Sequence, residues 1–204
     1  MTAISDAPPP LSFVTPLAWA LAQREHTAEL LLEQTHLEKK AAAAAVQFLF
    51  RVPVAADAQR ALSALAREEL LHFERSVRLL TQRGLALVPQ PPSPYAERLK
   101  AAAASRMPER LVDELLVAAV IEARSHERLE LLAVALAPTD PELAGFYADL
   151  AAAESRHAPL YVEVAAQVMP MAAVAVRHRA LIAHEETVLR ALPFAHRLHS
   201  GLPG

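Results

Sequence analysis

The sequence contains no cysteine and only four glycines among its 204 residues. The lack of cysteine excludes disulfides, thiolate metal sites and a cysteine nucleophile, and an intracellular protein fits this at least as well as a secreted one. Few glycines, together with runs such as Ala41 to Ala45, favour helices over sheets. At 53% hydrophobic residues the chain can close one sizeable core, so we expect a single all-α domain over residues 1–204.

The sequence also lacks an apolar run long enough to cross a bilayer. The longest, Val164 to Val176, contains Gln167 and Pro170 and is shorter than the roughly 18 to 20 residues required. The start of the chain has no signal-peptide pattern, so we expect a cytoplasmic protein with no membrane partner. A net charge of -3 neither indicates nor excludes a polyanionic partner, because the 20 Lys and Arg can cluster on one side.

Prolines and capping residues divide the chain into helices. We predict a short helix near 16–21, a long one ending near Phe50 before Val52-Pro53, and further helices over 57–83, 95–104, from 108 to before 138, from 141 to near 170, and over 173–192. Asp57 and Asp140 are the expected N-caps and Gly84 the C-terminal stop. Residues 1–15, with Pro8 to Pro10, are expected to be loose, and 193–204 to form a polar tail. Two tight hairpins joined by a long crossover make a four-helix bundle.

Two helices carry a Glu-x-x-His pattern on their apolar face. Residues three apart on a helix share a face, so Glu69 and His72 lie on the stripe of Leu62, Leu65, Phe73 and Leu80. Glu154 and His157 repeat the pattern on the stripe of Leu143, Tyr147, Leu150, Ala158, Tyr161 and Ala165. Each pair has an inward-facing glutamate upstream, Glu38 at 31 residues and Glu122 at 32.

Counting residues to each hairpin turn places all four glutamates at one height in the bundle. Burying isolated carboxylates costs several kcal/mol each even after relaxation, so a positive charge must accompany them. Two divalent metal ions carry +4 and balance the four carboxylates without any Lys or Arg in the core. Two histidines, two terminal carboxylates and two bridging ones fit such a dinuclear centre, and imidazole with carboxylate suits iron or manganese.

Other histidines in the chain are expected to have different roles. Glu33 and His36 repeat the same spacing but are turned by about 220° and 200° from Glu38, so we expect them to be solvated. His126, one turn after Glu122, is a candidate for a group behind the ligands. The others, including His178, His184, His196 and His199, are expected to be structural or exposed.

Four segments of the sequence resemble the MiaE family of tRNA hydroxylases, within the ferritin-like diiron carboxylate superfamily. They are HLEKKAAAAAVQFLFR (36–51), LAREELLHFE (65–74), RLVDELLVAAVIEARSHER (110–128) and FYADLAAAESRH (146–157), and the similarity extends over about 16–190. His126 departs from the pattern, since many members have cysteine there.

The resemblance implies a ferritin-like bundle and a non-haem diiron monooxygenase that hydroxylates the isopentenyl group of 2-methylthio-N6-isopentenyladenosine next to the tRNA anticodon. It implies two Fe ions, cycling between Fe²⁺ and Fe³⁺, with O₂ as co-substrate and an external electron donor, an electron-transfer protein or reductase. The implied ligands are Glu38, Glu69, His72, Glu122, Glu154 and His157.

Substrate contacts are less clearly marked in the sequence. A phosphate-binding face is one interpretation of the basic residues near helix ends, which include Lys39, Lys40, Arg51, Arg98, Lys100, Arg106 and Arg110; a solvated surface is the other. Leu31, Phe73, Leu115 and Phe146 are candidates for a prenyl pocket, or plain core. Two rival functions remain: a ferritin-like or rubrerythrin-like iron or peroxide-handling protein, including a dimanganese catalase, and a non-catalytic helical binding module. We expect a monomer or small oligomer with tRNA as partner.

Overall fold

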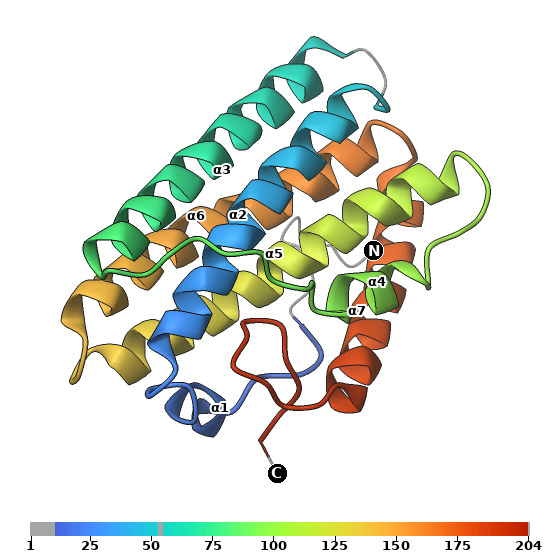
Figure 1. Ribbon diagram of the computed structural model, residues 1–204. Coiled ribbons are helices and arrows are strands. Elements are labelled where there is room, and N and C mark those ends of the chain that lie inside the picture. Colours follow the sequence, from blue (N-terminus) through green and yellow to red (C-terminus); the bar gives the residue numbers. More distant parts are fainter. Residues whose placement is uncertain (1–10, 53–54, 204) are drawn as a thin grey trace.

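The computed structural model describes residues 11–52 and 55–203, and within them every regular element is a helix (Figure 1). The predicted all-α architecture is therefore confirmed. The long helices are α2 (Thr27–Leu49), α3 (Ala56–Gln82), α5 (Glu109–Leu136) and α6 (Pro141–Ala166); the others are α1 (Leu17–Leu21), α4 (Tyr95–Lys100) and α7 (Met171–Ala191). Pro8 to Pro10 and Pro53, which marked predicted boundaries, lie outside the described residues.

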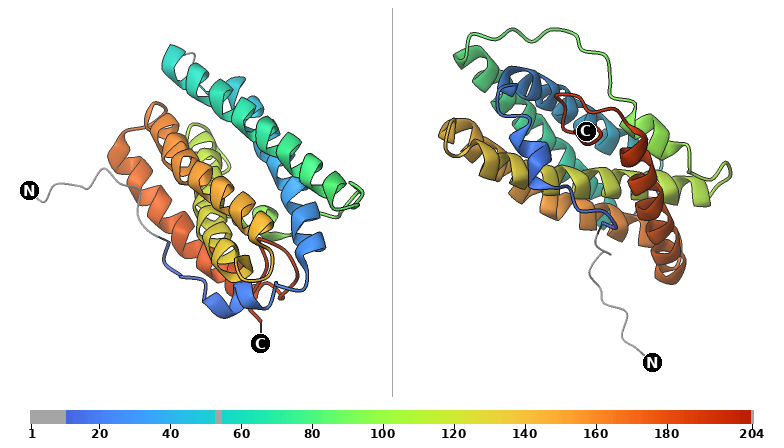
Figure 2. Two further views of the ribbon diagram at one scale, coloured as in Figure 1. Left: turned by 90° about the vertical axis from the view of Figure 1, so that its left-hand side faces the viewer. Right: turned by 90° about the horizontal axis from the view of Figure 1, so that it is seen from below.

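The four long helices form two hairpins. Helix α2 packs along α3, and α5 packs along α6, while α7 lies against α5 and α4 and closes one side (Figure 2). The connector over 85–94 carries the chain from the end of α3 across the outside of α2 to α4 (Figure 1). This is the crossover that the sequence predicts. None of the helices in the described part of the chain has the length and apolar character that a membrane span requires.

Two helix ends show why the hairpins turn where they do. Gly84 has a φ of 69°, and the Leu85 N–H donates to the Leu80 carbonyl at 2.9 Å, which ends α3 in a left-handed cap that favours glycine. Asp140 caps α6 by accepting from the Leu143 N–H at 3.0 Å. The prediction for Asp57 was wrong: α3 begins at Ala56 with no side-chain cap, and Asp57 lies in its first turn.

The apolar core is divided into two clusters, with polar residues between them. On α3, Leu62 and Leu65 belong to one cluster and Leu79 and Leu80 to the other. The same division occurs on the other three long helices, each of which has one or two of the predicted ligands between its two apolar stretches. A polar layer thus crosses the bundle at mid-height, as the level count predicts.

The C-terminal segment is not the polar tail that the sequence suggests. Residues 193–203 fold back against the bundle, and Leu198, His199 and Ser200 are buried. The N–H of Leu198 donates to Glu33 of α2 at 2.5 Å. This segment therefore covers a face of α2 that a simple four-helix bundle leaves to solvent.

Candidate metal centre

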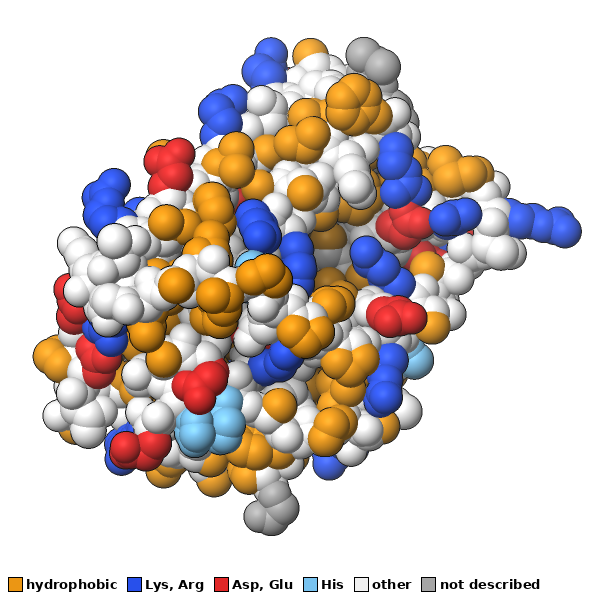
Figure 3. Space-filling view, in the orientation of Figure 1, with side chains coloured by type: hydrophobic (Ala, Val, Ile, Leu, Met, Phe, Trp, Pro, Cys, Tyr) orange, Lys and Arg blue, Asp and Glu red, His pale blue; other side chains and the backbone are white. Residues whose placement is uncertain are grey.

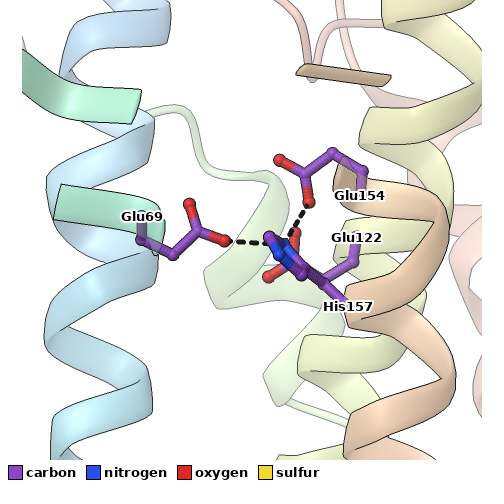
Figure 4. A group of neighbouring side chains, drawn as sticks. All are labelled: Glu69, Glu122, Glu154 and His157. Carbon is purple, nitrogen blue, oxygen red and sulfur yellow. Dashed lines mark hydrogen bonds and ion pairs between the residues drawn. The ribbon is translucent and has the colours of Figure 1, made fainter. Parts of the chain in front are cut away.

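Six predicted ligands from four helices lie together in the polar layer. None of them is more than 6% exposed: Glu38, Glu69, His72, Glu122, Glu154 and His157. One group consists of Glu69, Glu122, Glu154 and His157, whose ligand atoms all lie within 4.8 Å of one another (Figure 4). A second group of the same tightness consists of Glu38, Glu69 and His72. Glu69 belongs to both, so the two groups are adjacent.

Some of the atoms in this layer face one another without forming hydrogen bonds. His157 Nδ1 lies 2.8 Å from Glu69 Oε1 and 3.2 Å from Glu154 Oε2, and Figure 4 shows Glu69 reaching across from α3 toward α6. Both oxygens of Glu69 and Nδ1 of His72 nevertheless lack a partner with hydrogen-bond geometry. Buried polar atoms in native proteins normally have partners. Acceptors that converge on a common point without hydrogen bonds are arranged as metal ligands are.

Carboxylates outnumber the imidazoles in this layer by four to two, and without a metal ion they must share protons. Burial raises the pKa of Glu38 to about 7, and burial with the neighbouring carboxylate of Glu154 raises the pKa of Glu122 well above its usual range. Burial would also raise the pKa of Glu69, but its contacts with His157 and His72 outweigh this and lower it to about 2. Carboxylates held so close together favour protons or metal ions. The donor set of carboxylates and imidazoles fits iron.

A cavity of about 550 Å³ connects this layer with the surface. Its inner end is formed by Glu38, Glu122 and Glu154, and the charged residues at its outer end are the exposed Lys40, Lys100 and Glu97. Helices α2 and α5 each form a wall, and the connector with α4 forms a third. Figure 3 shows a hollow on this face of the molecule with Lys and Arg side chains gathered around it. The volume lies within the range of about 300 to 1,000 Å³ typical of small-molecule sites.

Comparison with known proteins identifies the family. The family model described as tRNA-(MS[2]IO[6]A)-hydroxylase (MiaE) matches residues 4–200. The chain belongs to the MiaE family. The tRNA 2-(methylsulfanyl)-N(6)-isopentenyladenosine(37) hydroxylase of Pseudomonas putida is 35% identical to it over 189 residues, or 93% of this chain and 91% of that protein. The hydroxylase of the same name from Salmonella typhimurium is 33% identical over 139 residues, or 68% of this chain and 50% of that protein.

A solved structure confirms the ferritin-like bundle. It is described as protein 43 with aldehyde deformylating oxygenase activity from Synechococcus, and it superposes with a TM-score of 0.86 at 38% identity. The match covers 94% of this chain and 96% of that one. Because the match covers nearly all of both chains, this MiaE family chain shares its whole helical framework with that protein.

The predicted substrate residues of this MiaE family chain lie in different places. Lys40 is at the cavity mouth, whereas the neighbouring Lys39 is exposed and does not belong to the described lining. Arg51 and Arg110 both pair with Glu114, Arg110 at 3.0 Å, which reduces their free charge. Arg106 is exposed in the turn before α5.

The apolar pocket residues were predicted less well. The described lining of the cavity does not include the four apolar candidates Leu31, Phe73, Leu115 and Phe146. Leu115 is fully buried in the core, and Phe73 is half-buried on α3. These two residues belong to the bundle itself, and the apolar wall comes instead from residues within two helix turns of Glu38 and Glu122: Leu37, Ala41, Ala44, Ala118 and Ile121.

Glu33 and His36 are not solvated, and that expectation was wrong. They are 3% and 8% exposed, because the C-terminal segment and the connector cover their side of α2. Glu33 accepts from Leu198, and His36 Nε2 lies 2.8 Å from the Val88 carbonyl oxygen. Burial raises the pKa of Glu33 to about 7. The two residues tie the outer segments to α2 and do not point into the polar layer with Glu38.

Among the other histidines, His126 contacts the Ala151 carbonyl at 2.9 Å and Glu130 at 3.7 Å, and its placement behind the ligands stays a prediction. His178 and His199 are buried, as structural histidines are.

Three residues near the site were not predicted as site residues by the sequence. Gln34 donates to Glu38 Oε1 at 2.6 Å, and Glu68 Oε2 lies 3.2 Å from His157 Nε2. Tyr161, one turn after His157, lines the cavity. Helical spacing from a ligand gives a signal for Gln34 and Tyr161. Nothing local distinguishes Glu68, whose partners lie on another helix.

Proposed function

We propose that this protein is an O₂-dependent tRNA hydroxylase that acts on the isopentenyl group of 2-methylthio-N6-isopentenyladenosine next to the anticodon. One structural observation supports this most: a single cavity joins a basic surface to a buried layer of carboxylates and histidines. An anionic polymer can dock at the outer end while a small apolar group reaches the inner end. The relatives' names supply the substrate, since geometry alone does not distinguish one prenylated base from another.

The metal is proposed to be a pair of iron ions held by Glu38, Glu69, His72, Glu122, Glu154 and His157. When bound, the irons supply the activation of O₂ and the insertion of one oxygen atom, with electrons from an external protein or reductase. The orphaned oxygens of Glu69 and the convergence of four carboxylates and two imidazoles support this assignment. We also propose one domain that works as a monomer or small oligomer.

The protein's own residues are proposed to position the ligands and to exclude water. Gln34 donates to Glu38 Oε1 at 2.6 Å and so fixes the rotation of that carboxylate. The small side chains of Ala41, Ala44 and Ala118 leave room for a prenyl chain beside the ligands. Apolar walls favour the prenyl group over water, which keeps the reacting carbon in a dry site.

Lys40 and Lys100 are the proposed phosphate contacts at the mouth. Both are exposed, and they belong to two different walls of the cavity, α2 and α4. Arg51 and Arg110 are weaker candidates because Glu114 already pairs with both. A nucleotide whose base enters the cavity leaves its flanking phosphates outside, near these two lysines.

Nucleoside mass spectrometry of tRNA tests the function directly. tRNA from cells lacking the gene is expected to carry the prenylated adenosine without hydroxyl, and restoring the wild-type gene is expected to add the mass of one oxygen atom. Restoring a Glu122→Ala variant is expected to add nothing, because one of the six proposed ligands is missing. If the nucleoside is unchanged between cells with and without the wild-type gene, the proposal is wrong.

The binding of tRNA at the cavity mouth has its own test. Replacing Lys40 and Lys100 together by Gln is expected to weaken tRNA binding and to reduce the salt slope by roughly 0.7 to 0.9 for each phosphate that a lysine no longer neutralises. The matched variant is Arg106→Gln with Arg110→Gln, which removes the same charge farther from the cavity. Equal salt slopes for the two double variants would remove the special role of the lysines.

A second candidate activity is suggested by the solved relative from Synechococcus, whose description names aldehyde deformylating oxygenase activity. The apolar cavity of this chain also suits an aliphatic aldehyde. Incubation of the iron-loaded protein with a long-chain aldehyde, O₂ and a reductant distinguishes the two. Formate released at a rate similar to tRNA hydroxylation would favour this activity, whereas we expect hydroxylation to dominate.

A further inference from the structure

The two histidines of the polar layer differ on their outer sides. His157 turns Nδ1 toward Glu69 and Glu154, and its other nitrogen, Nε2, lies 3.2 Å from Glu68 Oε2. His72 also turns Nδ1 inward, at 3.6 Å from Glu38 and 3.7 Å from Glu69. For its Nε2, no hydrogen-bond partner is found in the described part of the chain. One imidazole thus has carboxylates close to both of its nitrogens, whereas the other has them near its inner nitrogen only.

Glu68 is itself held in place by the helix that carries His157. Arg156 Nη2 donates to Glu68 Oε1 at 2.5 Å, and Arg156 Nη1 donates to the Ala152 carbonyl at 2.7 Å. Glu68 lies on α3 and Arg156 on α6, so the contact bridges the two hairpins. The carboxylate therefore has one oxygen for the guanidinium and one for the imidazole, and these two contacts restrain its orientation.

A carboxylate behind a ligating imidazole changes the ligand. It fixes which nitrogen carries the proton and how the ring is turned, and it makes the inner nitrogen a better donor to a metal. Mutation of such partners typically lowers metal affinity by about 10-fold to 100-fold. Glu68 satisfies the geometric requirement for His157.

The number of ligands adds to the difference. The group around His157 contains three carboxylates, whereas the group around His72 contains two. More carboxylates and a better imidazole donor both favour tighter binding of a divalent cation. Both observations therefore predict tighter metal binding in the group around His157.

We infer that the two metal positions are inequivalent, and that Glu68 is the positioning residue that makes the His157 position bind first and more tightly. The inference rests on the proposed metal centre but not on the identity of the substrate. The chain then passes through a one-metal form, with the His157 position filled, before it becomes competent for oxygen chemistry.

Metal titration tests this without any measurement of activity. Full-length protein stripped of metal is titrated with Co²⁺ under exclusion of air, and binding is followed by the visible absorption of the ion and by calorimetry. The wild type is expected to bind two ions in two steps, the first at least about tenfold tighter. Glu68→Gln, which keeps an acceptor but loses the charge, is expected to weaken the first step about tenfold and Glu68→Ala to weaken it more. The second step is expected to be unchanged.

The control is Asp149→Asn, which removes an exposed ion pair between the same two helices, Arg75 with Asp149 at 2.7 Å. It touches no histidine, so both binding steps are expected to stay as in the wild type. Thermal melting of the metal-free variants is expected to give similar midpoints, which separates positioning from loss of fold.

The outcomes are distinguishable. Two equal steps in the wild type, an unchanged first step in Glu68→Gln, or equal weakening of both steps would overturn the inference and leave the metal centre standing. No binding of Co²⁺ by the wild type would overturn the metal centre itself, and this inference with it.

Discussion

Two clusters of charge are buried in the same bundle, and they are neutralised in different ways. In one, Arg124 is fully buried and donates to both oxygens of Glu185 at 2.8 Å, while the Tyr95 hydroxyl donates to the same carboxylate at 2.9 Å. In the other, the oxygens of Glu69 have no hydrogen bond. We refer to them as the arginine cluster and the metal cluster.

The arginine cluster carries its own counter-charges. Arg124 also donates to the Phe13 carbonyl at 2.9 Å and to Thr15 at 3.1 Å, and it pairs with Glu127. Arg128 donates to carbonyls of the C-terminal segment and lies 4.4 Å from the centre of the Trp19 ring. This cluster joins α5 and α7 to the segment before α1 and to the C-terminal segment. The comparison teaches that the chain can satisfy a buried charge with its own hydrogen bonds, so the unpartnered oxygens of Glu69 in the metal cluster point to a ligand from outside.

The largest expected effect is in the arginine cluster. Arg124→Met is expected to lower the free energy of unfolding by about 3 to 5 kcal/mol, because it leaves the Glu185 carboxylate buried without its partner. Urea unfolding of metal-free protein measures this. The double variant Arg124→Met with Glu185→Leu is expected to recover most of the loss, and a double variant as unstable as the single one would contradict this account of the pair.

The metal cluster is expected to affect the free energy of unfolding mainly when a metal ion is bound. A divalent ion at a free concentration of 100 times its dissociation constant is expected to raise the free energy of unfolding by about 2.7 kcal/mol. Glu122→Gln is expected to change the metal-free protein little, because burial and Glu154 already favour the neutral form of Glu122 by raising its pKa. Its gain from metal is expected to be much smaller than that of the wild type. Equal gains in a thermal shift assay would show that the ion binds elsewhere.

The two clusters are also expected to change the free energy of unfolding with pH in different ways. His199 lies beside the arginine cluster. Burial, with Arg128 and Arg124 nearby, lowers the pKa of His199 to about 3, so its folded form binds fewer protons than the unfolded form below pH 6.5. Stability is therefore lost as the pH falls, by about 1.4 kcal/mol per pH unit for each such group. His199→Gln is expected to flatten this slope in urea unfolding between pH 7 and 5. An unchanged slope would exclude His199 as its source.

In the metal-free protein the two ligand histidines are expected to give stability the opposite pH dependence, so that it is lost as the pH rises. Burial alone would lower the pKa of His72 and of His157, but contacts with Glu69 and, for His72, with Glu38 raise both to about 9. Their contribution is fully present below pH 6.5 and is lost as the pH rises through 9. Metal loading removes this loss, because ligating imidazoles are already deprotonated.

The smallest expected effects come from two tyrosines of α6. Tyr161 lines the cavity beside the metal cluster, whereas Tyr147 is buried below it with an unpartnered hydroxyl. Tyr161→Phe is expected to lower kcat/KM about fivefold, equivalent to roughly 1 kcal/mol, because a hydroxyl available to the substrate is removed. Tyr147→Phe is the matched control, with unchanged kcat/KM. Equal kinetics for both variants would remove Tyr161 from the substrate site.

Much of the fold and the convergence of the six side chains followed from local patterns in the sequence. Helix ends such as Gly84 and Asp140 are set by the conformation of one residue or one hydrogen bond, which the sequence states directly. Counting residues from each hairpin turn predicts that the four glutamates meet, and the structure brings them together. Their role as iron ligands stays a prediction, because the sequence and the fold describe the donors and not the ion.

What the sequence missed depends on contacts between distant segments. The side of α2 that carries Glu33 and His36 is exposed in an isolated bundle, and only the path of the connector and the C-terminal segment buries it. Arg124 and Arg128 have the helical spacing of solvated charges, yet α1 and α7 with the outer segments cover them. A helical wheel gives the direction of a side chain but not what another part of the chain places over it.

Anomalous X-ray scattering at the iron edge, from crystals of protein loaded anaerobically with Fe²⁺, tests the central claim most directly. The account predicts two peaks per chain about 3.5 to 4 Å apart, bounded by Glu38, Glu69, His72, Glu122, Glu154 and His157. Peaks outside this layer, or none, with Glu69 and Glu122 paired to one another or to solvent, would contradict it.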